Sequence, residues 1–397
     1  MQKKITYRIG DVSKIYSGGD RPEIYSDIQN SECPIPIYSN GLDNEGLYGY
    51  TNKSQIEGDC ITVAARGVNI GTVFYRPTPF LPIVRLLSVI PDRTLVNAKY
   101  LYYYFQIDTI IGTGSAQPQL TIPFFQKKKI LIHEDISYQQ KIVSILSAYD
   151  NLIQNYKKQI EALQSAASEL YKEWFVRFRF PGWQNANFEN GIPEGWKYLK
   201  LSEFGYEVES GNRPAGGIDD SLEDGIPSLG AESIDKLGYF DYSNVKLVPR
   251  EFYDKMKRGH GKDNDILLYK DGAYIGKVTL FRNGFPFKEY AVNEHVFLLR
   301  SNNKNYQNYL YFTLNMPQYF TQMQNLNRNA AQPGLARGDL DRIKILVPDE
   351  RAIERFNKFV NPLIENTFSH SKQITNLTQQ RDLLLPRLMS GKLEVLK

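Results

Sequence analysis

The side chains in this sequence that could bind a metal ion or act as nucleophiles are few and scattered. Cys33 and Cys60 are too few for a cysteine-based zinc site or a disulfide framework. The imidazoles lack the paired spacing that brings two nitrogens to one metal ion, and they belong to His133, His260, His295 and His370. We therefore predict neither a metal site nor catalysis by a histidine or a thiol.

Two short motifs match catalytic signatures only in part. Gly112-Thr113-Gly114 begins like a dinucleotide fingerprint, but Gln117 stands where the third glycine is needed. Asn315-Met316-Pro317-Gln318-Tyr319 resembles the Asn-Pro-Pro-Tyr motif of adenine methyltransferases but lacks the second proline. The sequence also has no phosphate-binding loop of the Gly-x-x-x-x-Gly-Lys-[Ser/Thr] type. We predict no catalytic residues and expect a recognition protein instead.

The elements that would carry a recognition surface occur twice in the chain. Short motifs recur in constant order, for example Ser17-Gly18-Gly19-Asp20-Arg21-Pro22 with Ser210-Gly211-Asn212-Arg213-Pro214, Gly58-Asp59-Cys60-Ile61 with Asn264-Asp265-Ile266-Leu267, Asn69-Ile70-Gly71 with Tyr274-Ile275-Gly276, and Ala116-Gln117-Pro118 with Ala331-Gln332-Pro333. The separation grows along the chain, so surface loops differ in length while the scaffold is retained. We conclude that the chain contains an internal duplication.

Each repeat is predicted to be a mixed α/β domain, because short β-rich runs separated by Gly and Pro precede a helical stretch. The pairs Gly67/Gly71 and Gly272/Gly276 are typical of hairpin turns. The overall fold class is therefore α+β. We predict recognition domains over residues 1–138 and 198–350, a linker with two anchoring tryptophans over 179–197, and helical regions over 139–178 and 351–397.

Each repeat is followed by a long helix whose apolar residues are mostly four and three positions apart, as in a coiled coil. The two helices must run antiparallel for consecutive repeats to lie at opposite ends of one intramolecular coiled coil, which makes the fold pseudo-two-fold symmetric. Pro362, Thr367, His370 and Arg381 depart from the seam and indicate kinking or control of register. The predicted seam comprises Ile142, Leu146, Tyr149, Ile153, Tyr156, Ile160, Leu163, Leu170, Trp174, Ile353, Phe356, Val360, Leu363, Ile374, Leu377, Leu384 and Leu388.

Charge adds little to this interpretation. The net charge of +4 is compatible with proteins that bind no polyanion. Local basic clusters occur, but a run of like charges is by default a solvated face. The amino-terminal residues lack the apolar stretch of a signal peptide, and no apolar run approaches a membrane span of about 18 residues, so we expect a cytoplasmic protein. The basic clusters are Lys127-Lys128-Lys129 in the first repeat and Lys255, Lys257, Arg258 and Lys262 in the second.

Three motifs, together with the duplication, give the chain a resemblance to a known family. It resembles the specificity (S) subunit of Type I restriction-modification systems along essentially its whole length. The motifs are Glu173-Trp174-Phe175-Val176-Arg177-Phe178-Arg179-Phe180-Pro181-Gly182, Ile192-Pro193-Glu194-Gly195-Trp196 and Leu384-Leu385-Pro386-Arg387-Leu388-Met389-Ser390-Gly391-Lys392-Leu393.

The resemblance implies two target recognition domains that each read one half of a split site in duplex DNA. It implies that the helices set the distance between the half-sites and dock two modification subunits. Those partners would bind S-adenosylmethionine and methylate adenine, and restriction subunits would add translocation and cleavage driven by ATP with Mg²⁺. The chain itself would carry no cofactor and no active site.

Turns that match between the repeats are the best candidates for DNA contacts, because equivalent loops should face DNA equivalently. Arginine can pair with guanine and glutamine with adenine, whereas serine and lysine more often hold phosphates. The candidates are Ser17, Arg21, Arg66, Asn69 and Gln117 in the first repeat, and Ser210, Arg213, Lys270, Tyr274 and Gln332 in the second.

Three other readings remain open at the level of sequence. The chain could be a specificity subunit of a related system or an orphan one without a nuclease. It could instead be a non-catalytic scaffold that joins two protein-binding modules without DNA. A degenerate methyltransferase is the third reading and would require the isolated chain to bind S-adenosylmethionine. Steeply salt-dependent duplex binding would separate the DNA-binding readings from the scaffold.

Overall fold

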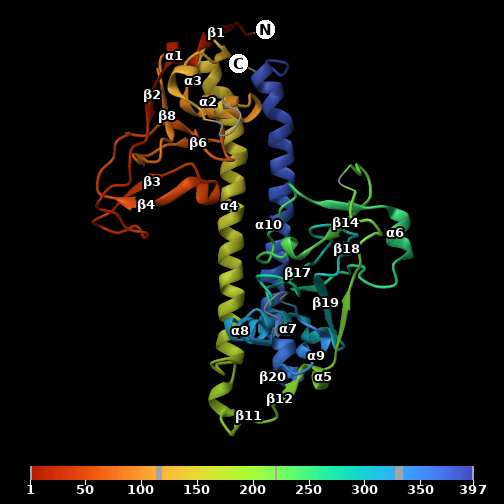
Figure 1. The fold of residues 1–397 in the computed structure, drawn as a ribbon. Coiled ribbons are helices and arrows are strands. Elements are labelled where there is room, and N and C mark those ends of the chain that lie inside the picture. Colours follow the sequence, from red (N-terminus) through yellow and green to blue (C-terminus); the bar gives the residue numbers. More distant parts are fainter. Residues whose placement is uncertain (1, 113–118, 220, 327–333, 396–397) are drawn as a thin grey trace. The chain divides into compact units, whose positions relative to one another are not determined.

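The computed structural model describes residues 2–112, 119–219, 221–326 and 334–395 (Figure 1). Its residues form two compact units. Unit 1 consists of Met1–Leu152 with Leu377–Lys397, and unit 2 of Ile153–Asn376. The predicted recognition domains each lie within one unit, and each long helix contributes one segment to each unit.

Unit 1 is built on two sheets and a separate strand pair. The four-stranded sheet is antiparallel and has the order β2-β8-β5-β6. The three-stranded sheet has the order β4-β3-β7, in which β3 and β7 are parallel. The strands are β1 (Lys4–Arg8), β2 (Ser13–Ser17), β3 (Ile35–Tyr38), β4 (Leu47–Thr51), β5 (Cys60–Val63), β6 (Val73–Arg76), β7 (Leu81–Pro82), β8 (Leu87–Pro91) and β9 (Lys129–His133), with β1 paired to β9.

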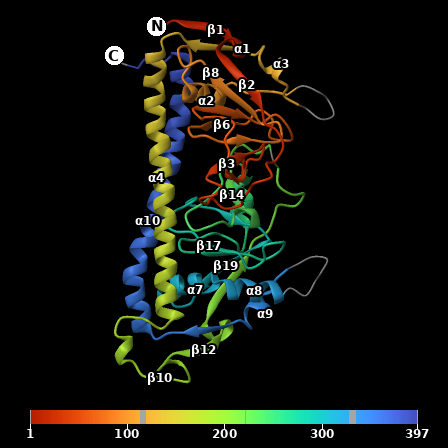
Figure 2. The same ribbon diagram turned by 90° about the vertical axis from the view of Figure 1, so that its left-hand side faces the viewer.

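The helices of unit 1 cover the four-stranded sheet. Helix α2 (Ala98–Ile107) packs against β5 and β6 (Figure 2), and it begins at Asn97, whose side chain accepts from the backbone N–H of Tyr100 at 3.0 Å. Because both faces of β5 are buried, this strand is hydrophobic without clear alternation. The shorter helices are α1 (Ile9–Val12), α3 (Ile122–Phe125) and the 3₁₀ turn η1 (Asp43–Gly46).

Unit 2 repeats the strand order of unit 1, which confirms the duplication. Its sheets have the orders β13-β19-β16-β17 and β15-β14-β18, with β14 and β18 parallel and β12 paired to β20. The strands are β12 (Lys197–Lys200), β13 (Tyr206–Ser210), β14 (Ile226–Leu229), β15 (Lys246–Val248), β16 (Ile266–Tyr269), β17 (Val278–Leu280), β18 (Ala291–Val292), β19 (Val296–Ser301) and β20 (Lys344–Val347). Its helices are α5 (Leu201–Phe204), α6 (Arg250–Lys255), α7 (Gln307–Leu314), α8 (Pro317–Leu326) and α9 (Arg337–Leu340), with η3 (Ala231–Ser233) and η4 (Lys304–Tyr306).

The strand registers correct the predicted alignment of the repeats by one residue. Ile61 pairs with Val89 and Ile266 with Leu299, at equivalent places in the two sheets. Ile61 therefore corresponds to Ile266 and not to Leu267. The hairpin that follows in each unit was aligned correctly, since Val63 pairs with Val73 and Leu268 with Val278.

The two long helices, α4 (Ile136–Phe175) and α10 (Glu350–Ser390), pair in each unit. In unit 1 the first part of α4 shares a core with the last part of α10, and Asp150 forms an ion pair with Arg381 at 2.8 Å. In unit 2 the ring centroid of Trp174 lies 5.9 Å from that of Phe356, and Tyr156 lies 4.8 Å from His370. Both units thus show the predicted antiparallel direction.

Burial follows the predicted seam more closely in α4 than in α10. The buried seam residues are Ile142, Leu146, Ile153, Ile160, Trp174, Ile353, Phe356, Val360 and Leu388, and the half-buried ones are Tyr149, Tyr156, Leu163, Leu170, Leu363, Ile374, Leu377 and Leu384. In α10 the buried positions fall instead on Ile364, Phe368 and Leu385. A straight helix has 3.6 residues per turn, so its buried face drifts from a strict heptad. The helix continues through Pro362.

The segment predicted as a linker is partly anchored. It contains η2 (Trp183–Asn185) and a hairpin of β10 (Phe188–Glu189) with β11 (Ile192–Pro193). Trp196 is buried beside Phe175 and donates to Asp349 at 3.1 Å. Trp183 is 39% exposed. Only one of the two tryptophans is therefore an anchor, and the prediction for Trp183 was wrong.

In each unit a glycine at the end of a strand of one sheet lies against the backbone of the other sheet. A Cβ on Gly18 would lie 2.7 Å from the carbonyl carbon of Pro82 in β7. A Cβ on the equivalent Gly211 would lie 1.6 Å from the carbonyl oxygen of Val292 in β18. Serine-glycine at the end of β2 and β13 is thus a packing requirement.

Gly18→Ala is expected to lower the free energy of unfolding by about 2–3 kcal/mol, because the backbone of β7 must move away. Gly19→Ala is the matched control, since a Cβ there meets nothing within 4 Å, and its effect should stay within about 0.5 kcal/mol. Urea denaturation of both variants measures the difference. Equal stabilities would contradict the close approach.

His133 makes unit 1 sensitive to acid. The imidazole is fully buried, and its Nδ1 lies 2.8 Å from the hydroxyl of Tyr100. No partner for Nε2 lies among the residues that the structure describes. Burial, and then the charge of Lys4, lower the pKa of His133 to about 4.

The free energy of unfolding is therefore expected to fall as the pH drops from about 6.5 to about 4. In this range His133 is protonated in the unfolded chain but stays neutral in the folded one. Between about pH 7.5 and pH 5 the loss from His133 amounts to about 2 kcal/mol. His133→Gln should flatten this part of the pH dependence in parallel urea titrations. A curve parallel to that of the unchanged protein would contradict the assignment.

Candidate nucleic-acid interface

In unit 1 the turn between β5 and β6 projects an apolar side chain. Gly67 and Gly71 have φ values of 76° and 87°, which a glycine adopts readily. Between them Val68 is fully exposed, whereas Arg66 and Asn69 are half-buried. A single exposed valine between two polar side chains gives this turn both apolar and hydrogen-bonding groups.

Asn40 joins this turn to a second one. Its Oδ1 accepts from the backbone N–H of Ala65 at 2.8 Å, and its Nδ2 donates to the carbonyl of Val84 at 2.7 Å. Its own carbonyl accepts from Nδ2 of Asn69 at 3.2 Å. One asparagine therefore fixes the 64–72 turn against the 83–86 turn. We call these two turns together the turn cluster of unit 1.

The 83–86 turn is strained. Val84 and Arg85 have φ values of 53° and 60°, and both side chains are exposed. A left-handed conformation is costly for a β-branched residue, of order 1–3 kcal/mol. The backbone N–H groups of Val84 and Arg85 donate to the carbonyls of Gly19 and Gly18 at 2.8 and 3.1 Å. Strain held in place at an exposed position indicates function.

A buried guanidinium supports the neighbouring loop of unit 1. Arg76 is 3% exposed, and its guanidinium lies 3.6 Å from the ring centroid of Tyr38. It donates to the hydroxyl of Thr62 at 3.1 Å and to the carboxylate and carbonyl of Glu45 at 3.2 and 2.5 Å. Burial lowers the pKa of Arg76. Its contacts hold the left-handed Asn44 and Glu45.

The equivalent turns of unit 2 carry charges that are paired with one another. The strand registers make Glu294 and His295 the counterparts of Val84 and Arg85. Glu294 Oε1 lies 3.3 Å from Nε of Arg213 and 3.4 Å from Nε2 of His295, and Asp271 Oδ2 lies 3.2 Å from Nδ1 of His295. These turns, with Tyr274 at 64% exposure, form the turn cluster of unit 2.

The residues predicted from the sequence to contact DNA differ in their exposure and in their partners. Ser17 is exposed and Ser210 half-buried at equivalent strand ends. Arg21 is exposed, with its guanidinium 4.8 Å from the ring of Tyr25. Nζ of Lys270 forms an ion pair with Oδ2 of Asp271 at 2.5 Å, and the lysine side chain is only 20% exposed. Lys270 is therefore poorly suited to hold a phosphate. Gln117 and Gln332 lie outside the described residues.

Arg66 and Lys270 are not equivalent, although both were chosen from matching turns. The backbone of Arg66 forms an isolated β-bridge with Gln119, and the backbone of Asp271 forms the corresponding β-bridge with Gly334. Asp271 is thus the counterpart of Arg66. The sequence prediction missed Asn40, Val68, Arg85, Glu294 and His295. The repeat gave a usable signal for the last three, because Val84-Arg85-Leu86-Leu87 aligns with Glu294-His295-Val296-Phe297.

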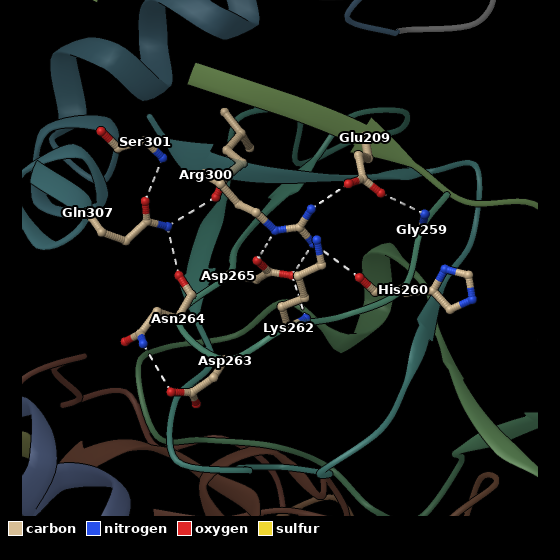
Figure 3. A network of polar contacts seen from close by, with 11 residues as sticks. Glu209, Gly259, His260, Lys262, Asp263, Asn264, Asp265, Arg300, Ser301 and Gln307 are labelled. Carbon is tan, nitrogen blue, oxygen red and sulfur yellow. Dashed lines mark hydrogen bonds and ion pairs between the residues drawn. The ribbon is translucent and has the colours of Figure 1, made fainter. Parts of the chain in front are cut away.

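Unit 2 also contains an ion network centred on Arg300 (Figure 3). Arg300 donates to Asp265 at 2.5 and 2.7 Å, to Glu209 at 2.5 Å and to the carbonyl of His260 at 3.1 Å. Burial opposes the charge of Arg300, but hydrogen bonds and the charges of both carboxylates raise its pKa. Burial likewise opposes the charge of Glu209, but the N–H of Gly259 and Arg300 lower its pKa.

The described part of the chain contains neither a cluster of metal-ligating side chains nor an apolar helix of spanning length. Within those residues no group of three His, Cys, Asp or Glu side chains is placed to hold a metal ion. No helix there is long and apolar enough to cross a membrane.

Comparison with known proteins defines the class. Two copies of one α/β domain, joined through shared helices, match the model of the Type I restriction modification DNA specificity domain over residues 1–165 and 193–379. The chain belongs to this family.

Individual relatives agree with this assignment. The chain is 31% identical to the MjaIX specificity subunit of a Type I restriction enzyme from Methanocaldococcus jannaschii, over 82% of this chain and 76% of the relative. It is 26% identical to the MjaVIII specificity subunit of the same organism, over 98% and 92%. Among solved structures, the S subunit of a Type I restriction-modification system from M. genitalium has a TM-score of 0.64 at 17% identity, covering 98% of this chain and 96% of that one, which shows the shared fold.

Asn40→Ala is expected to release both turns of unit 1, since it removes the side-chain hydrogen bonds to Ala65 and Val84. The Ala65 amide loses its acceptor and should exchange with solvent deuterium at least about tenfold faster, as for a lost bond of about 1.4 kcal/mol. Hydrogen exchange followed by mass spectrometry reports this change. The exposed Asn52→Ala is the control, and unchanged exchange near Ala65 would contradict the role of Asn40.

Proposed function

We propose that this chain is the DNA specificity subunit of a Type I restriction-modification complex and reads a split site in duplex DNA. The observation that carries the proposal is the duplication: each unit presents a turn cluster at equivalent places of the same fold. Two equivalent surfaces on one chain suit two half-sites separated by a fixed gap. Membership of the specificity family supports the same function.

The turn cluster of unit 1 is suited to bases with acceptor edges. Arg66 and Arg85 can donate to guanine, and Asn69 to adenine. Val68 can contact the methyl group of thymine. The turn cluster of unit 2 offers acceptors as well, since Asp271 and Glu294 could accept from the amino group of cytosine. We infer that the half-sites differ in sequence.

The long helices serve as spacer and docking element in this proposal. Each contributes to both units, so its length sets the gap between half-sites. Apolar side chains remain exposed on α10, Phe359 at 53% in unit 2 and Leu383 at 65% in unit 1, and exposed apolar groups support a protein partner. We propose two modification subunits there, which bind S-adenosylmethionine and methylate adenine. Restriction subunits, using ATP and Mg²⁺, complete the complex.

The test is to coexpress the full chain with its modification subunit and map N6-methyladenine across a host genome. We expect methylation at a split motif with a constant gap. Stable assembly without such a motif would contradict DNA reading, and absence of any assembly would favour a scaffold of protein-binding modules.

Arg85→Ala and Tyr274→Ala make the same experiment specific for each unit. Removing one bidentate base contact costs about 1–3 kcal/mol, so Arg85→Ala should relax one half of the motif and leave the other half and the gap unchanged. Tyr274→Ala should affect the opposite half. A variant that alters both halves, or the gap, would contradict independent reading by the two units.

A further inference from the structure

Unit 2 contains an extension that unit 1 lacks. Between β15 and β16 the chain forms α6 and a basic segment, 255–262, whereas a much shorter connection joins β4 to β5. The shorter connection, 52–59, has one cation, Lys53, and two carboxylates, Glu57 and Asp59. The basic segment instead carries Lys255, Lys257, Arg258 and Lys262 and has no carboxylate, while α6 before it adds Arg250, Glu251 and Asp254.

The extension is fixed at both ends. At its start, Arg250 donates to both carboxylate oxygens of Glu289 at 3.0 and 3.3 Å. At its end, Nε2 of His260 lies 2.9 Å from the carbonyl of Tyr253, and the two rings are 4.5 Å apart. The basic segment thus lies between two contacts that tie the extension to the rest of unit 2 and to α6.

The ion network around Arg300, in which Asp265 is buried and Arg300 and Glu209 are partly buried, supplies the remaining restraints. Glu209 accepts from the backbone N–H of Gly259 at 2.9 Å, and Arg300 donates to the carbonyl of His260 at 3.1 Å (Figure 3). A buried ion pair contributes little net stability, because desolvation offsets the attraction between its charges. Fixing one geometry is its better-attested effect. Here the geometry that it fixes is the backbone at Gly259 and His260.

Two cations of the extension remain available to a ligand. Lys257 and Arg258 are exposed, and no carboxylate among the described residues lies within ion-pair distance of either. Lys255 is instead paired with Glu251 at 2.6 Å. The two free cations line a hollow of about 470 Å³ together with Asn212, Phe252, Lys255 and Met256.

The hollow lies beside the residues proposed to read DNA. A Cβ on Gly259 would lie 2.4 Å from the Cα of Gly211, so the basic loop touches the segment that carries Asn212 and Arg213. Asn212 adds an amide donor beside the two cations, and lysine, arginine and amide side chains are common phosphate ligands. Arg213 itself is occupied by Glu294 at 3.3 Å.

We propose that Lys257, Arg258 and Asn212 form a site for the phosphodiester backbone, on an extension that the 52–59 connection of unit 1 lacks. The site rests on the proposed function and adds to it a contact made by unit 2. Unit 2 holds the DNA backbone independently of sequence at this hollow, and the ion network around Arg300 positions the loop for that contact.

The test measures how duplex affinity depends on salt, using the full chain assembled with its modification subunits. Each phosphate contact contributes about 0.9 to the slope of log affinity against log salt. Lys257→Ala/Arg258→Ala should reduce the slope by about 0.9 to 1.8, equally on duplexes with correct and with altered half-sites. Lys255→Ala is the matched control, as a neighbouring cation already paired with Glu251, and it should change the slope by less.

Glu209→Ala separates positioning from charge. If only net charge matters, removing this carboxylate should strengthen DNA binding. If Glu209 positions the loop through Gly259, its removal should weaken DNA binding and reduce the slope of log affinity against log salt. Stronger binding by this variant would overturn the positioning role. A double variant that matches Lys255→Ala, or that loses affinity on only one DNA sequence, would overturn the phosphate site itself. Failure of the unchanged complex to bind duplex DNA would instead contradict the proposed function.

Discussion

The structure depends on one constraint: neither unit has a complete hydrophobic core without a segment of each long helix. In unit 1, Ile142 and Leu146 of α4 share a core with Leu385 and Leu388 of α10. In unit 2, Trp174 and Phe175 of α4 share a core with Ile353, Phe356 and Val360 of α10. Burial of apolar surface is the main favourable term in folding. The helices are therefore part of the core of each domain and do more than connect two domains that would fold without them. Any change in their length must therefore preserve both cores, which makes the helices suitable for fixing a distance.

Polar side chains far apart in sequence then set the loops on this scaffold. Each unit uses a guanidinium for the purpose, but on different strands: the buried Arg76 ends β6 in unit 1, and the partly buried Arg300 lies in β19 in unit 2. Arg76 holds the left-handed residues before β4, whereas Arg300 holds the backbone carbonyl of His260. Such groups must be fully partnered when buried, so each one fixes the geometry of the loop that supplies its acceptors. The loops can differ in sequence because each has its own restraint.

Much of the fold could be predicted from sequence, because its signals are local or repeated. Glycine turns such as Gly67/Gly71, heptad spacing and the recurrence of short motifs require no knowledge of distant contacts. The candidate site was harder to predict. Asn40 forms its hydrogen bonds with Ala65 and Val84, and no pattern near Asn40 indicates those partners. The one-residue error between Ile61 and Ile266 has a similar origin, since only strand pairing shows which residues are opposite. Burial in α10 drifted from the heptad for a geometric reason that a seven-residue template ignores.

The paired charges of unit 2 show how duplicated domains can diverge without loss of the scaffold. At the position of exposed Arg85, unit 2 has His295 between Asp271 and Glu294, and the cations Lys270 and Arg213 are both occupied. A surface whose cations are neutralised internally has little attraction left for a phosphate backbone. Unit 2 nevertheless carries Lys257 and Arg258, which have no ion-pair partner among the described residues, on an extension that the 52–59 connection of unit 1 lacks. If both proposals hold, base reading and backbone attraction are combined in Arg66 and Arg85 of unit 1 but fall to separate loops in unit 2. The turn cluster of unit 2 could then change its charge without changing the contact that Lys257 and Arg258 make with the DNA backbone.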